Sequence, residues 1–290
     1  MTESSTESKQ MSKEIQPQEQ QIQNDAGANA AVSAAGDTAA ETCGISVVIP
    51  AFNEGEGIEA CLKSLCDQTL PRDRYEIIVV DGNSKDNTRE VAAKYADKVF
   101  IQTSKKVGGA RNDGVLASRY DWVVTADADC FFPRTWLETI VNDFKEHPEA
   151  VVFYGPIYPL EPGVKYKVEI FLYNRIVHAG GKLGFFYATL GANTAFRKKE
   201  FIEAGMYRVC DAGDDWELPF RMKKLGKIHL DMKMVVGFSM RRYINFGLLR
   251  SGFQWFYVVA KGGDSDKQQY MGKTYTKKED KKEKKKKDKE

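Results

Sequence analysis

The sequence predicts an α/β fold with a mostly parallel sheet flanked by helices. Short apolar runs alternate strictly with segments of helical periodicity along the first half of the chain. Each apolar run ends in polar or glycine-rich residues, as strands do when their carboxyl ends form a ligand site. The composition agrees, because 42% of the residues are hydrophobic and 11% are aromatic, enough for a substantial core.

Four apolar runs predict buried strands in this first half. They are rich in β-branched and aromatic residues and nearly continuous, as in strands covered on both faces of a parallel sheet. They lie at Ile45–Ile49, Tyr75–Val80, Lys98–Gln102 and Trp122–Val124. We expect Pro50 to end the first of them, because proline interrupts a strand.

Segments with helical spacing separate these strands. Ile58, Cys61, Leu62, Leu65 and Cys66 recur on one helical face, so both cysteines are expected in the core. Further helices are expected after the cap-forming residues at 86–88, from the glycine pair at 108–109, and over 137–144.

The second half of the chain is less regular. It predicts a strand, a proline-rich connection, a helix and a glycine-rich loop at Ala150–Tyr154, Gly155–Gly163, Val168–Val177 and Gly180–Gly184. A strand over Thr189–Phe196 and a short helix after the acidic residues Asp211–Glu217 should follow, with Gly226 ending that helix. Alternation of Ile228, Leu230, Met232 and Met234 with polar residues predicts a half-buried strand.

Composition divides the chain into four expected parts. Residues 1–43 lack aromatic residues and should form a disordered tail, and residues 44–240 form the main domain. Residues 241–270 form an aromatic, partly helical extension, in which 243–260 suits either a core helix or one lying on a membrane. Residues 271–290 are lysine-rich, and we favour a solvated, disordered tail over an electrostatic arm for anionic lipid.

Several classes of protein are disfavoured by composition. The five cysteines contain no C-x-x-C pair, which argues against a zinc site or a disulfide framework and fits a reducing cytoplasm. The first 23 residues lack the apolar core of a signal peptide, and no apolar run approaches the roughly 20 residues of a membrane span. We therefore expect a cytoplasmic protein, at most peripheral at the cytoplasmic face of an anionic membrane, with no nucleic-acid partner.

Two aspartates directly follow the strand that begins at Trp122. Asp127 and Asp129 are two residues apart, which in extended backbone places both carboxylates on one side of the chain. Such carboxylates repel each other unless a proton or cation lies between them, and oxygen ligands favour magnesium, manganese or calcium. A solvated acidic turn is the alternative interpretation of this pair alone.

Six motifs occur in a fixed order, and together they resemble glycosyltransferase family 2, which has an inverting GT-A fold. They are Val47-Val-Ile-Pro-Ala-Phe-Asn-Glu54, Val79-Val-Asp-Gly-Asn-Ser-Lys-Asp-Asn-Thr88, Gly108-Gly-Ala-Arg-Asn112, Ala126-Asp-Ala-Asp129, Gly191-Ala-Asn-Thr-Ala-Phe196 and Gly213-Asp-Asp-Trp-Glu-Leu-x-x-Arg221. The resemblance covers about Ile45 to Arg242. The chain departs from the family where Gly82 replaces a second aspartate after Asp81, and where Asp214-Asp215 replaces the commoner Glu-Asp.

The resemblance implies a metal-dependent inverting glycosyltransferase. It would move a sugar from a nucleotide-diphosphate sugar, expected to be UDP-linked, to a hydroxyl of an unknown glycan or lipid-linked acceptor. The implied cofactor is Mn²⁺ or Mg²⁺, bound by Asp129 with Asp127, and the implied catalytic base is Asp215. The nucleotide would contact Pro50, Ala51, Glu54, Asp81, Gly109, Arg111 and Asp127. The donor or acceptor sugar would contact Asn193, Asp214, Trp216 and Arg241.

Other functions remain open at this point. A nucleotidyltransferase would carry a cationic glycine-rich loop after the first strand, and Pro50–Gly55 contains no lysine or arginine. A non-catalytic nucleotide-sugar or glycan-binding module would have no use for Asp215 as a base. Structural roles compete for single residues: a surface ion pair for Arg111, helix capping for Asp215 and core packing for Trp216.

Overall fold

A seven-stranded sheet forms the centre of the computed structural model, which describes residues 44–184, 187, 189–210, 213–241, 244 and 257. The strand order is β3-β2-β1-β4-β7-β5-β8, and all neighbours pair in parallel except β7, which is antiparallel to β4 and β5. The strands are β1 Ile45–Ala51, β2 Tyr75–Asp81, β3 Lys98–Ile101, β4 Trp122–Thr125, β5 Ala150–Tyr154, β7 Thr194–Arg197 and β8 Lys227–Leu230. The predicted mostly parallel sheet is confirmed.

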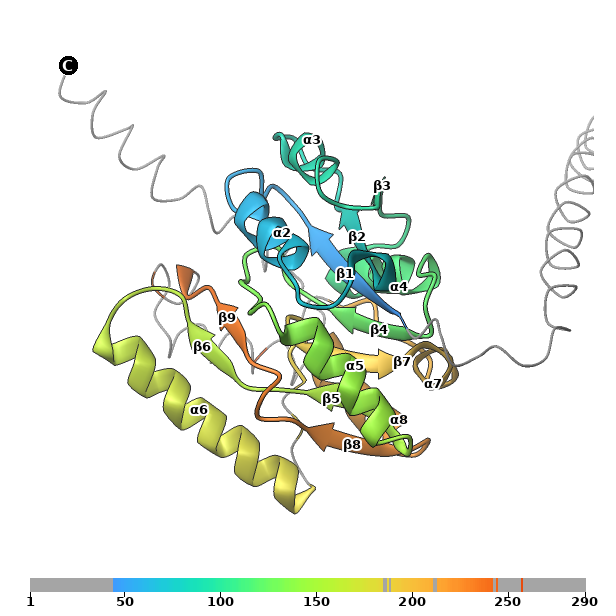
Figure 1. The fold of residues 1–290 in the computed structure, drawn as a ribbon, viewed down its shortest axis with the longest axis vertical. Helices are drawn as coiled ribbons and strands as arrows, with labels where there is room; N and C mark the ends of the chain where they lie inside the picture. The colour runs from blue at the N-terminus through green and yellow to red at the C-terminus, as the bar shows by residue number, and fades with distance from the viewer. Residues whose placement is uncertain are drawn as a thin grey trace, which may run out of the picture. The chain divides into compact units, whose positions relative to one another are not determined.

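Helices cover both faces of this sheet (Figure 1). The helices are α2 Ile58–Cys66, α3 Thr88–Ala92, α4 Lys106–Leu116, α5 Trp136–Glu146, α7 Lys198–Glu203 and α8 Asp214–Met222. Successive strand residues point to opposite faces, so Val47 packs in one cluster with α2, α3 and α5, and Val48 in another with α4, α7 and α8. Because both faces are covered, the strands need continuous apolar sequence.

A smaller two-stranded sheet and a long helix lie beside the main sheet. Strand β6, Ile157–Pro159, pairs in parallel with β9, Val236–Phe238, and helix α6, Val164–Leu183, runs alongside them (Figure 1). A 3-10 turn, η1 Arg72–Arg74, precedes β2. No helix in the described part of the chain combines the length and apolar character needed to cross a membrane.

Two predicted chain breaks are wrong. Strand β1 continues through Pro50 to Ala51, because Pro50 lies beyond the last β1 residue that pairs with β4, so the strand is paired on one side only there. The predicted loop at Gly180–Gly184 is instead the end of α6. A Cβ atom on Gly181 would lie 2.4 Å from the hydroxyl oxygen of Tyr154, so this glycine permits close packing rather than a turn.

Other boundaries also differ from the prediction. The expected connection at Gly155–Gly163 contains β6, and the strand expected from Thr189 begins only at Thr194. The strand expected to reach Met234 ends at Leu230, where Asp231 accepts a hydrogen bond from the backbone N–H of Lys233 and turns the chain. Of the two α2 cysteines expected in the core, Cys61 is buried but Cys66 is exposed. The predicted tails 1–43 and 271–290, and most of the extension 241–270, lie outside the described residues.

Candidate active site

The carboxyl ends of β1, β2 and β4 meet at one edge of the sheet because these three strands are parallel neighbours. Glu54 follows β1, Asp81 ends β2, and Asp127 and Asp129 follow β4. Since β7 is antiparallel, the loop before it, at 189–193, reaches the same edge from the other direction. The topology therefore gathers acidic side chains from distant parts of the sequence.

Asp81 holds together the loops after β1 and β2. Its carboxylate is fully buried and accepts hydrogen bonds from the backbone N–H of Ser84, at 2.8 Å, and from the Ser84 hydroxyl, at 2.6 Å. The Ser84 hydroxyl oxygen accepts in turn from the N–H of Asn53, at 2.8 Å. Asn53 has φ 54°, the left-handed backbone that asparagine tolerates better than most residues. Asp81 thus sets the shape of this end of the site.

Arg111, on α4, joins two acidic segments that lie far apart in sequence. Its Nη2 contacts Asp127 Oδ1 at 2.9 Å, and its Nη1 contacts Asp214 Oδ2 at 2.9 Å. Burial opposes the charge of the guanidinium, but Asp127 and Asp214 outweigh burial and raise the pKa of Arg111 above its usual value. Burial also disfavours the charged form of Asp214 and raises the pKa of this carboxyl group, although Arg111 opposes the rise. We call Arg111 with its two partners, Asp127 and Asp214, the Arg111 fork, and its contact with Asp214 joins α4 to α8.

The glycines near Arg111 are required by close approach. A Cβ atom on Gly191 would lie 2.1 Å from Nη2 of Arg111, so only glycine leaves room for the fork. A Cβ atom on Gly109 would lie 2.7 Å from the Cβ of Ser104, and one on Gly108 only 2.4 Å from the carbonyl oxygen of Arg208. The Gly-Gly-Ala-Arg motif therefore seats the first turn of α4 tightly against its neighbours.

Asp215 lies in the first turn of α8, after Gly213, whose φ of 86° suits glycine. Its carboxylate accepts a hydrogen bond from the N–H of Gly191 at 3.1 Å, and its backbone carbonyl accepts one from the Thr189 hydroxyl at 2.6 Å. Burial, followed by the neighbouring Asp214, raises the pKa of Asp215 to about 7, although Arg111 opposes the rise. A carboxylate with a pKa near the working pH is suited to general base catalysis.

Arg241 bridges Glu54 and Asp129. Its Nη2 lies 3.1 Å from Glu54 Oε2 and 3.1 Å from Asp129 Oδ2. Burial and the nearby Asp127 raise the pKa of Asp129, while burial and Asp129 raise the pKa of Glu54. These carboxylates repel one another and favour a cation between them, and the guanidinium of Arg241 supplies one.

The same carboxylates fit a divalent cation of the magnesium type. Among the described residues, no three acidic, histidine or cysteine side chains gather closely enough to hold a metal ion by themselves. An ion at Asp129 would therefore take one or two protein carboxylates and fill its other positions with phosphate oxygens and water. Mg²⁺ is bound in this way in many phosphate-handling enzymes, and the carboxylates that lie near Asp129, those of Asp127 and Glu54, offer the oxygen donors that it prefers.

The structure places most of the predicted site residues at this edge. Asn193 differs from the others, because its side chain is engaged by neighbouring protein groups. The Asn193 side chain accepts from Trp136 Nε1 at 3.0 Å and donates to the carbonyl oxygens of Met234, at 2.7 Å, and Pro156, at 3.3 Å. Both of its amide hydrogens are used, so Asn193 supports the wall of the site. Ala51 acts through its backbone, since its carbonyl oxygen accepts from the N–H of Gly82 at 2.7 Å.

Tyr207 is a site residue that the sequence did not indicate. Its ring is buried, and the guanidinium carbon of Arg111 lies 5.7 Å from the ring centre. Its backbone N–H donates to Asn112 Oδ1 at 3.0 Å, and its carbonyl oxygen accepts from Asn112 Nδ2 at 2.8 Å. Asn112 belongs to the motif around Arg111, but nothing in the sequence near Tyr207 points to its partner.

The described part of the chain has a GT-A fold. Staphylococcus aureus TarS 1–349 in complex with UDP-GlcNAc has a similar fold, with a TM-score of 0.55 and 18% identity over 68% of this chain and 59% of that chain. The mannosyltransferase PcManGT from Pyrobaculum calidifontis, in complex with GDP-Man and Mn²⁺, has a TM-score of 0.57 and 20% identity over 76% of this chain and 65% of that chain. These likenesses confirm the predicted fold.

The chain belongs to glycosyl transferase family 2, whose model matches residues 46–206. The glycosyltransferase AglE of Haloferax volcanii is 37% identical over 104 residues, which are 34% of this chain and 34% of AglE. A Methanococcus voltae protein, dolichyl N-acetyl-alpha-D-glucosaminyl phosphate 3-beta-D-2,3-diacetamido-2,3-dideoxy-beta-D-glucuronosyltransferase, is 25% identical over 225 residues, 73% of this chain and 63% of that protein. The chain thus aligns with between a third and just under two thirds of these relatives' lengths. The family prediction is confirmed.

Proposed function

We propose that this protein transfers a sugar from a nucleoside-diphosphate sugar, UDP-linked, to an acceptor hydroxyl, with inversion at the anomeric carbon. The observation that carries the proposal is the Arg111 fork. It joins Asp127, at the end of β4, to Asp214, the neighbour of Asp215, at 2.9 Å each. One rigid network thus holds the carboxylates of the donor side and the base of the acceptor side in fixed relation.

The donor is assigned to the edge formed by β1, β2 and β4. Glu54 and Asp81 are proposed to hydrogen-bond the ribose and base, with Pro50, Ala51 and Gly109 lining the nucleotide through their backbone. The solved neighbours support a nucleotide sugar in general, since one binds UDP-GlcNAc and the other GDP-Man. The choice of uridine over guanosine belongs to the proposal.

The charge of the site supports a divalent cation, Mn²⁺ or Mg²⁺, held by Asp129 with Asp127 nearby. Carboxylates outnumber the guanidinium groups of Arg111 and Arg241, so an incoming diphosphate meets net negative charge. A bound cation supplies charge neutralisation for the departing diphosphate. Arg241, which contacts Asp129 and Glu54, lies where it could also meet the charge of the donor phosphates.

Asp215 is the proposed catalytic base. Its carboxylate takes the proton of the acceptor hydroxyl while that oxygen attacks the anomeric carbon from the side opposite the diphosphate. The hydrogen bond from the N–H of Gly191 fixes one carboxylate oxygen, which leaves the other for the acceptor. Asp214 keeps Arg111 in place, and Trp216 offers an aromatic surface beside the base for a sugar ring.

The acceptor is proposed to be a glycan or a lipid-linked sugar. The names of similar proteins include a poly(ribitol-phosphate) glucosyltransferase, a dolichyl-phosphate-linked sugar glucuronosyltransferase and a cholesterol galactosyltransferase. We also propose a location at the cytoplasmic face of a membrane. Most of the aromatic extension, and all of the lysine-rich end, lie outside the described residues.

A panel of sugar nucleotides tests the proposal by thermal shift, with and without Mn²⁺. We expect one donor to raise the melting temperature only when the metal is present. With Asp129→Asn, the metal concentration needed for the same shift should rise roughly tenfold or more, because one ligand to the ion is lost. Asp121→Asn is the matched control, since Asp121 is an exposed acid at the opposite end of β4.

The outcomes separate the competing functions. Donor hydrolysis or transfer that requires Mn²⁺ and Asp129 supports a metal-dependent glycosyltransferase. A donor-induced shift with no turnover on any acceptor would indicate a non-catalytic binding module. Absence of a shift with every nucleotide, with or without metal, would sink the proposal.

A further inference from the structure

Helix α6 turns a row of large apolar side chains away from the protein. They recur on one helical face, and each is between 50% and 78% exposed. They are Val164, Val168, Phe171, Leu172, Ile176 and Leu183. A contiguous exposed apolar face of this size marks an interaction surface, and we call these six residues the outer face of α6.

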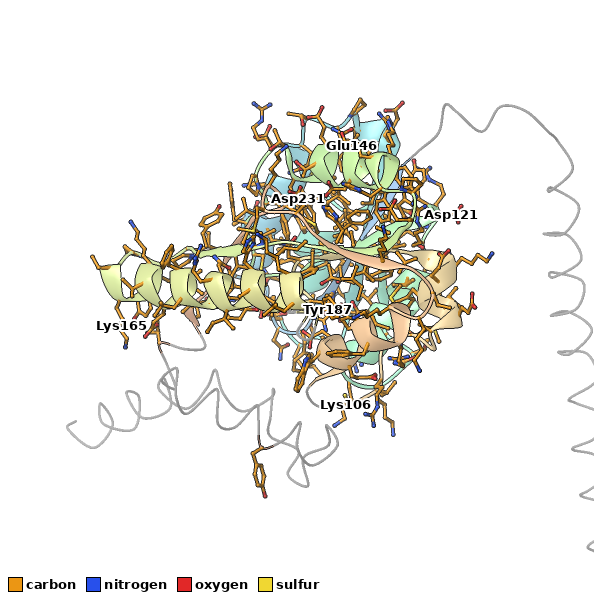
Figure 2. The ribbon with its side chains drawn as sticks, turned by 90° about the horizontal axis from the view of Figure 1, so that it is seen from below. Lys106, Asp121, Glu146, Lys165, Tyr187 and Asp231 are labelled. Carbon is orange, nitrogen blue, oxygen red and sulfur yellow. The ribbon has the colours of Figure 1, made fainter. Side chains whose placement is uncertain are left out.

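The opposite side of α6 fixes the outer face in this direction. Ile170 and Val177 are buried against the domain. The Asn174 side chain donates to the carbonyl oxygen of Ile157 at 2.7 Å and accepts from the Ile157 N–H at 3.2 Å, which ties α6 to β6. Figure 2 shows α6 extending from the body, with Lys165 near its far end and Tyr187 near the other. The helix cannot roll to bury its outer face without breaking these contacts.

Basic side chains lie among the apolar ones. Lys165, Lys167, Arg175 and Lys182 are all exposed, whereas the single acid of α6, Glu169, lies 3.9 Å from Lys165. A second copy of the chain docked by two-fold symmetry would bring these positive charges against one another. An anionic bilayer instead accepts both kinds of side chain, because apolar groups enter the acyl boundary and long basic side chains reach the phosphates.

We propose that the outer face of α6 docks on a bilayer containing anionic lipid, with the helix lying in the interface. This deepens the membrane location proposed above by assigning it to a described surface, and it does not depend on the transfer reaction. The surface is linked to the candidate site, because β6 pairs with β9 and Arg241 follows the end of β9 by three residues. Docking would therefore bring a lipid-linked acceptor near the acidic edge.

Vesicle flotation of the full chain tests the proposal. Vesicles of phosphatidylcholine with about a third phosphatidylglycerol are compared with pure phosphatidylcholine, and we expect the protein to float only with the anionic vesicles. Combined Phe171→Ser, Leu172→Ser and Ile176→Ser should lower partitioning roughly tenfold or more, because three apolar side chains leave the interface. Lys167→Glu with Arg175→Glu should lower it by a similar factor, and added salt should mimic this effect.

Control variants change exposed residues of the same kinds elsewhere in the molecule. Leu116→Ser, Ile202→Ser and Val209→Ser remove apolar side chains that are 42% to 53% exposed, and they should leave flotation unchanged. Lys145→Glu with Lys199→Glu serves the same purpose for charge, since both lysines are exposed. Circular dichroism and melting temperatures show that each variant is folded.

Each outcome decides the assignment. Loss of flotation in the α6 variants alone supports it. If the natural chain floats and the α6 variants float equally, another segment binds the membrane and the α6 proposal is wrong, while the membrane location stands. If the natural chain does not float, both are wrong. If the natural chain does not float but sediments as a dimer, and only the α6 variants are monomeric, then the outer face of α6 binds a second copy of the chain instead of a bilayer.

Discussion

Asp215 shows how a single residue acquires its chemistry from its surroundings. Burial and the adjacent Asp214 raise its pKa to about 7, so near neutral pH half of the molecules carry the charged base. The transfer rate at saturating donor should therefore rise as the pH increases from about 6 and level off above about 8. A pH–rate profile measures this, and a rate that falls over the same interval would contradict the assignment.

Replacement of the carboxylate isolates the role of Asp215. Asp215→Asn keeps the size of the side chain and an oxygen for the Gly191 N–H but cannot take a proton, so transfer should fall by roughly 10²–10⁴. Donor affinity, measured by thermal shift, should change little. Loss of donor binding would instead assign Asp215 to the nucleotide, and Asp121→Asn provides the surface control.

The identity of the site residues was more predictable than their contacts. The order of strands placed Asp81, Arg111 and Asp127 at one sheet edge, because parallel strands end together, and the family resemblance added Asp215. The sequence did not predict that the Asn193 side chain would hydrogen-bond Trp136 and two carbonyl groups, since those partners come from three distant segments. The same applies to the bridge of Arg241, which depends on the path of β9.

Among the elements, α4 depends most on small side chains. A Cβ atom on Gly114 would lie 2.3 Å from Val48 Cγ1 and 3.0 Å from Val80 Cγ2, so α4 rests directly on β1 and β2. Gly114→Ala should lower the free energy of unfolding by about 1–3 kcal/mol, because overpacking outweighs the better helix propensity of alanine. Urea unfolding measures the change. Gly57→Ala is the control, since its nearest contact would be an ordinary 3.5 Å.

Periodicity predicted the long elements and failed on those defined by packing. Helices α2 and α5 and the strands β1, β2, β4 and β5 were found because continuous or regularly spaced apolar residues report burial directly. Gly181 was interpreted as a loop residue because a sequence does not reveal what a glycine faces, here Tyr154. Strands β6 and β9 have three residues each, too few to show any period.

The stability of the whole molecule should depend on Asp143 and Asp231, two neighbouring acids outside the candidate site. Burial, then Asp231, raises the pKa of Asp143 to about 7, although Lys233 opposes the rise. The folded state therefore binds this proton more tightly than the unfolded state does. Its contribution to stability is fully present below about pH 4 and is lost as the pH rises through about 7.

Asp143→Asn removes this dependence. At pH 8 the variant should have a higher melting temperature, equivalent to a free energy of unfolding that is higher by roughly 1–3 kcal/mol, and the increase should be smaller at pH 5. Scanning calorimetry at the two pH values measures the difference, with Asp121→Asn as the exposed control. An equal effect at both pH values, or a lower melting temperature at pH 8, would show that Asp143 acts through packing instead.

In the seven-stranded sheet, the position of the antiparallel strand β7 in the chain also suggests an order for folding. Strands β1 to β4 and their pairings with one another all lie within residues 45–125, so the donor edge can assemble from that part of the chain alone. Strand β7, which pairs Thr194 with Thr125, comes later in the chain, and Asp215 follows only after it. On a ribosome, the half that is proposed to hold the nucleotide would thus emerge and collapse first. The proposed base would join it only after some ninety further residues had been made, so an unfinished chain would bind donor without the means to use it.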